Sequence, residues 1–140
     1  MARSKTTRLI VLDTSGLLAA LAADDDHHDD AVTVLDNDAG PALIPAGMLA
    51  EAGYLIETKL GLEVLDVFLL DLIDGAFTFD CDDGDFPRVR DLVTRYADLS
   101  LGLADASVIA CAERTGAPIL TFDRRDFAVV AREGRVRLRP

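Results

Sequence analysis

Short apolar runs alternate with helical segments along this chain, and few folds accommodate that alternation. Residues 9–12 and 42–44 are runs too short for a helix, and each precedes a segment whose apolar residues recur three and four positions apart. Runs at 76–79, 118–122 and 136–138 repeat the pattern. Strands buried on both faces are continuously apolar, and strand–helix alternation builds parallel sheets. The sequence therefore predicts an α/β sandwich with a mainly parallel central sheet flanked by helices.

Proline and glycine residues delimit the helical segments. We expect helices at about 14–21, 30–38, 45–59, 61–75, 86–96 and 103–114. Pro45 suits the first turn of its helix, because the N–H group that proline lacks has no intrahelical partner there. Gly61, Gly75 and Gly116 follow apolar helical stretches and are expected to end them.

The size and composition of the chain indicate a globular protein. Its 140 residues are enough for a single domain, 1–140, in which 1–8 form a flexible basic extension. Hydrophobic residues make up 50% and charged residues 28% of the sequence, as in soluble proteins. Cys81 and Cys111 form no CxxC pattern, so a reducing cytoplasm is expected. The run at 9–12 is too short for a secretion signal, and no stretch has the roughly 20 apolar residues of a membrane span.

Charge is distributed unevenly along the chain. The net charge is −11, and Lys59 is the only basic residue between Leu9 and Pro87. Residues 124–140, in contrast, contain six arginines and two acids, a local net charge of +4. An acidic protein is a poor general binder of nucleic acid. The basic C-terminal segment could hold a phosphate backbone, bind an acidic protein or simply be solvated, and the sequence does not separate these alternatives.

Four acidic residues stand where carboxylates are unusual. Asp13 and Asp123 each follow an apolar run directly, and α/β sheets bind ligands at the carboxyl ends of their strands. Glu51 and Asp105 lie on or beside the apolar faces of their expected helices, next to Met48, Leu55, Leu101, Val108 and Ile109. Taken alone, Glu51 could be an ordinary surface glutamate, and Asp105 could be a first-turn acid favoured by the helix dipole.

Gathering these carboxylates requires a positive partner. Clustered carboxylates repel one another and raise each other's pKa, and between Leu9 and Pro87 the only basic residue is Lys59. A divalent cation relieves the repulsion, and carboxylate oxygens suit Mg²⁺ or Mn²⁺. Such an ion activates water and stabilises charge on a phosphate group. The pattern therefore favours metal-assisted phosphodiester hydrolysis.

The same four acids stand in motifs that together resemble the PIN domain. The motifs are Val11-Leu12-Asp13-Thr14-Ser15, Pro45 with Glu51, Leu103-Ala104-Asp105-Ala106-Ser107 and Thr121-Phe122-Asp123-Arg124-Arg125-Asp126-Phe127. The order Asp, Glu, Asp, Asp, with intervals of 38, 54 and 18 residues, and the segment 96–106 are most similar to VapC-type toxins of bacterial toxin–antitoxin systems. The resemblance covers about residues 9–138.

The resemblance implies a three-layer sandwich and an endoribonuclease that requires Mg²⁺ or Mn²⁺. It also implies RNA as substrate, a VapB-type antitoxin as partner, a homodimer and no membrane association. By position, Asp13 and Asp105 would be the core metal ligands. Asp123 would complete the metal site or position a second ion, and Glu51 would orient the attacking water.

Further residues are carried over as supports of the site. Ser15 and Thr121 match hydroxyl positions that bind water or the carboxylates. Asp98 and Asp126 are candidate outer acids, for which a helix-end or turn role is equally open. Gly102 stands where many relatives carry another acid or hydroxyl, so the outer part of the site differs there.

Two other acid-based families fit less well. A haloacid-dehalogenase-type phosphatase needs a second aspartate where this chain has Ser15, and a phosphorelay receiver domain needs a late lysine, yet none follows Lys59. The remaining alternative is a PIN-fold binding module that has lost catalysis and acts through protein or RNA contacts.

Two groups of residues are expected to have ordinary roles. His27 and His28 lie in an acidic run, and a solvated loop is the simplest interpretation. An apolar stripe is expected in the core, with part of it available for a dimer surface or antitoxin groove: Leu62, Leu65, Phe68, Leu69 and Leu72.

Overall fold

A five-stranded parallel sheet organises the computed structural model, which describes residues 8–38, 40–99 and 101–140 apart from the side chains of Asp38 and Asp126. The strands are β1 (Ile10–Leu12), β2 (Ala42–Pro45), β3 (Thr78–Asp80), β4 (Ile119–Leu120) and β5 (Leu138–Arg139). Their order is β3-β2-β1-β4-β5, and each paired neighbour is parallel. The predicted α/β class is confirmed. Of the expected N-terminal extension, only Arg8 is among the described residues, so that prediction remains untested.

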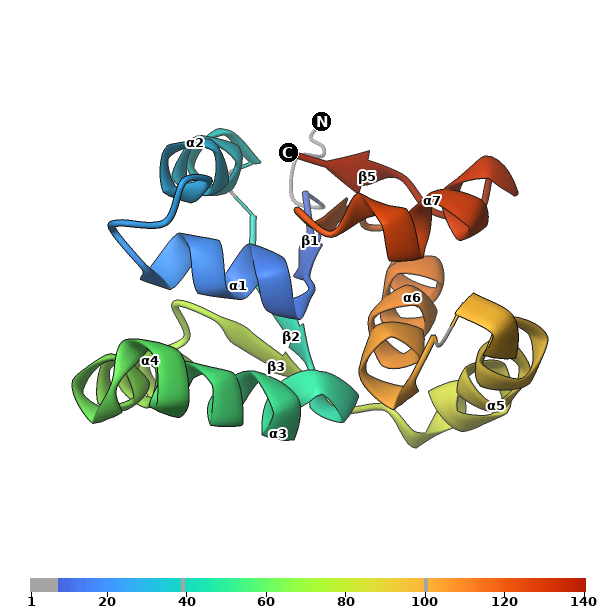
Figure 1. Cartoon of the computed structure of the whole chain (residues 1–140), viewed down its shortest axis with the longest axis horizontal. Coiled ribbons are helices and arrows are strands. Elements are labelled where there is room, and N and C mark those ends of the chain that lie inside the picture. The colour runs from blue at the N-terminus through green and yellow to red at the C-terminus, as the bar shows by residue number, and fades with distance from the viewer. Residues whose placement is uncertain (1–7, 39, 100) are drawn as a thin grey trace, which may run out of the picture.

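Strand β1 is the centre of the sheet. Val11 pairs with Leu43 of β2 on one side and with Ile119 of β4 on the other. The three residues of β1 are completely buried. Helices cover both faces, with α1 (Thr14–Leu21) on one side of β1 and α6 (Leu103–Thr115) on the other, as Figure 1 shows. This placement explains why the strand sequence is continuously apolar.

The other helices largely follow the sequence prediction. They are α2 (His28–Asp38), α3 (Ala46–Leu55), α4 (Leu62–Asp74), α5 (Phe86–Arg95) and α7 (Arg124–Arg132), with a π-helical segment at Ile56–Leu60 and 3₁₀ turns at Asp83–Asp85 and Ala97–Leu99. Gly61, Gly75 and Gly116 adopt φ of 100°, 85° and 74° at helix ends, a region that glycine enters without the steric penalty of a side chain.

Three expectations need correction. Pro45 is the last residue of β2 and the N-cap of α3, rather than part of the first helical turn, because it stays extended to pair beside Asp80. The helix expected at 45–59 is α-helical only to Leu55 and continues as the π-helical segment. The strand expected at 76–79 corresponds to β3, which begins two residues later, at Thr78. Helix α7 had no counterpart among the expected elements.

Helix α4 is only partly a core helix. Phe68 is fully buried and Leu65 and Leu72 are half-buried, whereas Leu62 and Leu69 are exposed. Other large apolar side chains on or near this helix are also exposed: Tyr54, Val67, Leu70 and Ile73. The predicted stripe therefore divides into a core row and an exposed apolar face. Within the described ranges, no helix is long and apolar enough to cross a membrane.

Arg114 fixes the segment after β3 to the end of α6. Its guanidinium donates to both Asp85 oxygens, at 2.8 and 3.0 Å, and to Asp80, and it also lies 3.5 Å from Asp82. These hydrogen bonds raise the pKa of Arg114, so it stays charged. Because planar guanidinium groups bind carboxylates in a bidentate manner, this residue joins α6 to the connection between β3 and α5.

Candidate active site

The turn from β1 into α1 places Asp13 in a buried position. The residue is 3% exposed and caps α1, where its Oδ1 accepts the Gly16 N–H at 2.7 Å. The Ser15 hydroxyl donates to the same oxygen at 2.8 Å. Aspartate is a preferred N-cap because its carboxylate accepts an otherwise unpaired helix N–H. Gly16 is required here, since a Cβ at this residue would lie 2.3 Å from the Leu120 carbonyl oxygen.

The end of β4 supplies the other support of Asp13. The Thr121 hydroxyl, fully buried, donates to Asp13 Oδ2 at 2.5 Å and accepts the Asp123 N–H at 3.0 Å. Nearby, the Phe122 N–H donates to Ser15 Oγ at 2.9 Å. The two strand ends that stand out in the sequence are therefore connected by hydroxyl groups, and Ser15 and Thr121 both contact Asp13.

Burial is the main influence on the Asp13 carboxylate. Loss of water raises its pKa, and the negative charge of Asp123 raises it further. The hydrogen bonds from Thr121, Gly16 and Ser15 act in the opposite direction but do not cancel the effect of burial. An ionised carboxylate at this place is therefore costly without a cation, which is the condition that favours metal binding.

Glu51 approaches the same region from α3. The Thr14 hydroxyl donates to Glu51 Oε2 at 2.9 Å, and the Glu51 side chain is otherwise exposed to solvent. Thr14 is the residue after Asp13, so this hydrogen bond ties α3 to the turn that presents the buried aspartate. Sequence reasoning missed the role of Thr14, although its place directly after Asp13 was a usable signal.

Helix α6 carries Asp105 in its first turn, half-buried. The helix packs closely on α3, because a Cβ at Gly47 would lie 1.9 Å from Ser107 Oγ and 2.5 Å from Ser107 Cβ. Gly47 precedes Glu51 by one helical turn, and Ser107 follows Asp105 by two residues. The absence of a side chain at Gly47 thus sets the separation of the helices that carry Glu51 and Asp105.

The structure does not assemble all the expected residues into one cluster. In the described part of the chain, no three His, Cys, Asp or Glu side chains converge closely enough to hold a metal ion. Asp98 is exposed in the 3₁₀ turn at Ala97–Leu99, and the side chain of Asp126 lies outside the described residues. The chemistry of the donors nevertheless suits a hard cation. A carboxylate offers about four lone-pair positions, and Asp13 uses three of them for its bonds to Ser15, Gly16 and Thr121. About one position therefore remains through which Asp13 can bind a cation.

The two histidines are more ordered than a solvated loop. His28 is half-buried at the start of α2 and donates from Nδ1 to the Ala19 carbonyl at 2.8 Å. His27 is exposed, and its ring stacks on Phe122 with a centroid separation of 4.5 Å and an angle of 10°. The expectation of an exposed loop residue is confirmed for His27, which lies in a turn, and is wrong for His28, which begins α2. The contact was not predictable because it depends on the path of the loop after α1.

Comparison with known proteins places this arrangement in a family. Residues 10–133 match the PIN domain. The chain belongs to the PIN-domain family. Ribonuclease VapC26 of Mycobacterium tuberculosis is 31% identical to this PIN domain over 123 residues, which cover 86% of this chain and 91% of that protein.

Solved structures share the fold of this PIN domain at lower identity. M. tuberculosis VapC20, described as a toxin that cleaves the sarcin–ricin loop, has a TM-score of 0.78 and 18% identity, with coverage of 94% of this chain and 99% of that one. VapBC2 from Rickettsia felis, solved with a DNA fragment from its promoter, has a TM-score of 0.67 and 16% identity, with coverage of 93% and 96%. FitAcB from Neisseria gonorrhoeae has a TM-score of 0.59 and 17% identity, with coverage of 94% and 96%.

Proposed function

We propose that this PIN domain is an endoribonuclease that acts in the cytoplasm as the toxin of a VapBC-type toxin–antitoxin pair. The observation that carries the proposal is the buried Asp13 carboxylate, whose pKa is raised by burial and by Asp123 at the carboxyl edge of the sheet. The likeness to Ribonuclease VapC26 over most of the chain supports RNA as the substrate. A perturbed carboxylate of this kind is typical of catalytic sites.

Asp13, Asp105 and Asp123 would hold Mg²⁺ or Mn²⁺ in this proposal. When bound, such an ion lowers the pKa of water and offsets charge on the phosphate group. The protein holds one of these ligands, Asp13, through Ser15 and Thr121, whose hydroxyls donate to its two oxygens.

Glu51 is the residue we assign to proton transfer. Its Oε2 accepts the Thr14 hydroxyl, and this hydrogen bond restrains the carboxylate beside the turn that carries Asp13. Oε1 would take the proton of the attacking water. Because the pair Thr14–Glu51 is exposed to solvent, the proton can then pass to bulk water.

The proposed partners are an antitoxin and a second copy of the chain. The exposed apolar face of α4, with Leu62, Leu69, Leu70 and Ile73, supports a protein partner, because monomeric proteins rarely leave a large contiguous apolar surface uncovered. The fold is shared with VapBC2 of R. felis. We therefore propose a VapB-type antitoxin as the protein that this toxin meets.

Cleavage of total cellular RNA tests the proposal directly. The purified, antitoxin-free protein is incubated with Mg²⁺ or Mn²⁺, with EDTA, and as the Asp13→Ala variant. We expect discrete fragments that disappear with EDTA and with Asp13→Ala, whereas Asp30→Ala, which removes an exposed acid on α2, leaves them unchanged. Circular dichroism establishes that each variant is folded.

The alternative, a PIN-fold binding module that has lost catalysis, predicts different results. Such a protein cuts no RNA under any of these conditions even though it is folded. It also gains no thermal stability from Mn²⁺, whereas a protein that binds the ion only when folded melts at a higher temperature in its presence. Absence of both effects would refute the nuclease.

A further inference from the structure

An aromatic pair lies beside the proposed active site, and neither ring has a role in the proposed hydrolysis. The His27 ring is stacked nearly parallel to Phe122, 4.5 Å between centroids. Phe122 lies between Thr121 and Asp123, and its N–H donates to Ser15 Oγ. The pair is therefore attached to the same hydroxyl that holds Asp13.

The loop that carries His27 is held on both sides. The Asp25 carboxylate accepts the His27 N–H at 2.8 Å, and the His27 carbonyl accepts the Ala31 N–H at 3.0 Å at the start of α2. The next residue, His28, is fixed to the Ala19 carbonyl of α1. Although one face of its ring lies on Phe122, His27 remains exposed. The backbone at His27 is thus held by hydrogen bonds on both sides, and its ring rests on Phe122.

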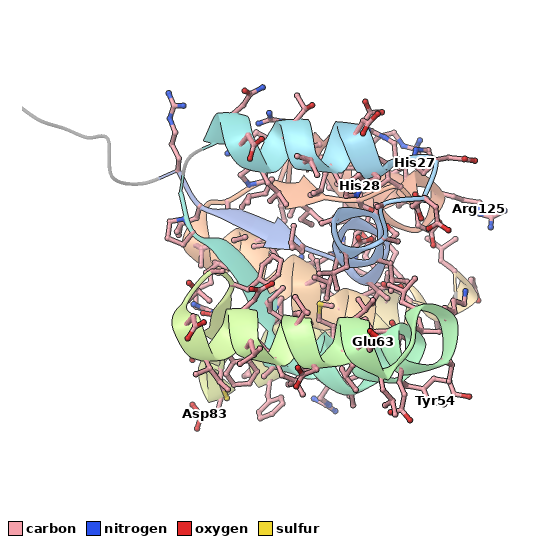
Figure 2. All side chains as sticks on the ribbon, turned by 90° about the vertical axis from the view of Figure 1, so that its left-hand side faces the viewer. His27, His28, Tyr54, Glu63, Asp83 and Arg125 are labelled. Atoms are coloured by element: carbon pink, nitrogen blue, oxygen red, sulfur yellow. The ribbon has the colours of Figure 1, made fainter. Side chains whose placement is uncertain are left out.

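The place of the pair connects it to the substrate. Figure 2 shows His27 and Arg125 at the side of the molecule toward which the β1 arrow points, the carboxyl edge of the sheet. Arg124 and Arg125 begin α7 directly after Asp123, and both are exposed. An RNA strand bound at this edge of the sheet would therefore meet both the exposed arginines and the aromatic pair.

Flat exposed rings of this kind suit unpaired bases. Single-stranded RNA is recognised largely by stacking of its bases on aromatic side chains, histidine included, whereas bases within a duplex are already stacked. Only a base that has left its helix can reach a ring that already lies on Phe122.

We propose that His27, backed by Phe122, is the platform on which an unpaired base next to the scissile phosphate stacks, and that it helps to select the cleavage site. This inference rests on the proposed ribonuclease function. His27 acts by binding and positioning the substrate, so its loss affects KM more than kcat. Because every base has an aromatic face, the platform selects unpaired nucleotides and prefers purines for their larger surface.

An abasic scan of a cleaved RNA tests the platform. The strongest site cut in total RNA is mapped, and a 12-nucleotide RNA spanning it is made in versions that each lack one base. We expect removal of one base beside the cut to lower kcat/KM of the wild type about 5- to 100-fold, the loss typical of one stacked base. His27→Ala should lower kcat/KM on the complete RNA to the same extent, and the same abasic change should then have no further effect.

Matched variants separate stacking from other effects. His27→Tyr keeps a flat ring and should retain most of the activity, and Asp26→Ala, a neighbouring exposed change, should be neutral. The platform is overturned if His27→Ala cuts the complete RNA as the wild type does, or if the abasic loss is undiminished in that variant.

Failure of the nuclease and failure of the platform give different results. If the folded wild type cuts no RNA, the proposed function is refuted. The abasic series is then made from a 12-nucleotide RNA of mixed sequence, and the affinity of the protein for each version is measured by fluorescence anisotropy. A loss of affinity in His27→Ala that matches one abasic position supports the platform in that case too. Equal affinity for all versions in both proteins refutes it.

Discussion

Replacing Gly47 with alanine should force apart the two helices that carry Glu51 and Asp105. The added Cβ would lie 2.5 Å from Ser107 Cβ, and carbon atoms in contact lie about 3.5–4.0 Å apart. Rotation of the serine hydroxyl relieves the contact with Oγ but not the contact with Cβ. The helices must therefore separate by about 1 Å at this crossing.

The free energy of unfolding should fall as a result. Overpacking of a well-fitted contact costs about 1–3 kcal/mol, and the higher helix propensity of alanine returns up to about 1 kcal/mol. We expect a net loss of about 1–2 kcal/mol, which lowers the melting temperature by several degrees. Because a misplacement of about 1 Å can reduce catalysis about 100-fold, cleavage of RNA should fall by more than stability alone explains.

Gly53→Ala is the matched control for this prediction. Gly53 belongs to the same helix, yet a Cβ there meets nothing within 4 Å, so that variant should be more stable than the wild type by about 0.5–1 kcal/mol. Urea denaturation gives the free energy of unfolding of Gly47→Ala and of Gly53→Ala. Adding Ser107→Gly to the Gly47→Ala variant should recover part of the lost stability. If Gly47→Ala proves as stable as Gly53→Ala, the close helix crossing does not constrain the site.

Other predictions concern the groups around Asp13 and the arginine at the end of α6. Asp13→Asn, melted in EDTA at pH 7, should be more stable than the wild type by about 1 kcal/mol, because a raised pKa makes the ionised form unfavourable in the folded state. The gain should shrink as the pH falls toward 3.8, where the unfolded aspartate is also protonated, and a gain that is the same at all pH values would contradict ionisation of Asp13 as its cause. Thr121→Val should cost about 1–3 kcal/mol in urea denaturation, because the buried Asp13 carboxylate and the part-buried Asp123 N–H lose their partner, and Thr121→Ser should restore most of it. Arg114→Met should cost about 1–2 kcal/mol at low salt and less in about 1 M NaCl, and salt-independent melting of both proteins would show that the ion pairs contribute little.

The strand ends of the site were the most predictable part of the structure. Asp13 and Asp123 directly follow apolar runs in the sequence. Because parallel sheets bind ligands at the carboxyl ends of their strands, these positions alone were enough to predict a site there. Ser15 and Thr121 were expected as supports, and both donate to Asp13 in the structure. The apolar runs indicated the strand ends, whereas the two hydroxyl residues were expected from the resemblance to the PIN domain.

Contacts that depend on the exact path of a loop or helix were not predictable. The stacking of His27 on Phe122 requires the loop after α1 to return over the end of β4, and no local pattern encodes that path. Pro45 was expected in the first turn of a helix because proline has no N–H that would need a partner there. Its φ of −65° suits either state, and pairing with β3 keeps it extended. Helix α7 was not predicted because charged residues dominate its first turn and only two of its buried apolar residues, Phe127 and Val130, show helical spacing.

The hydrogen bond from Thr121 to Asp13 has a consequence for how this protein is made. It joins residues 108 positions apart, and β4, which ends at the residue before Thr121, occupies the place beside β1 opposite β2. While the ribosome is still adding residues, a nascent chain without β4 has β1 unpaired on that side, and Asp13 lacks the hydroxyl donor that Thr121 supplies. Proteins acquire structure from the N-terminus during synthesis, so the first half of the chain can fold locally while the hydrogen bonds of Asp13 stay incomplete. Products released before β4 is made therefore lack the complete proposed site, and under the proposed function we expect nuclease activity only after translation has passed the fourth strand.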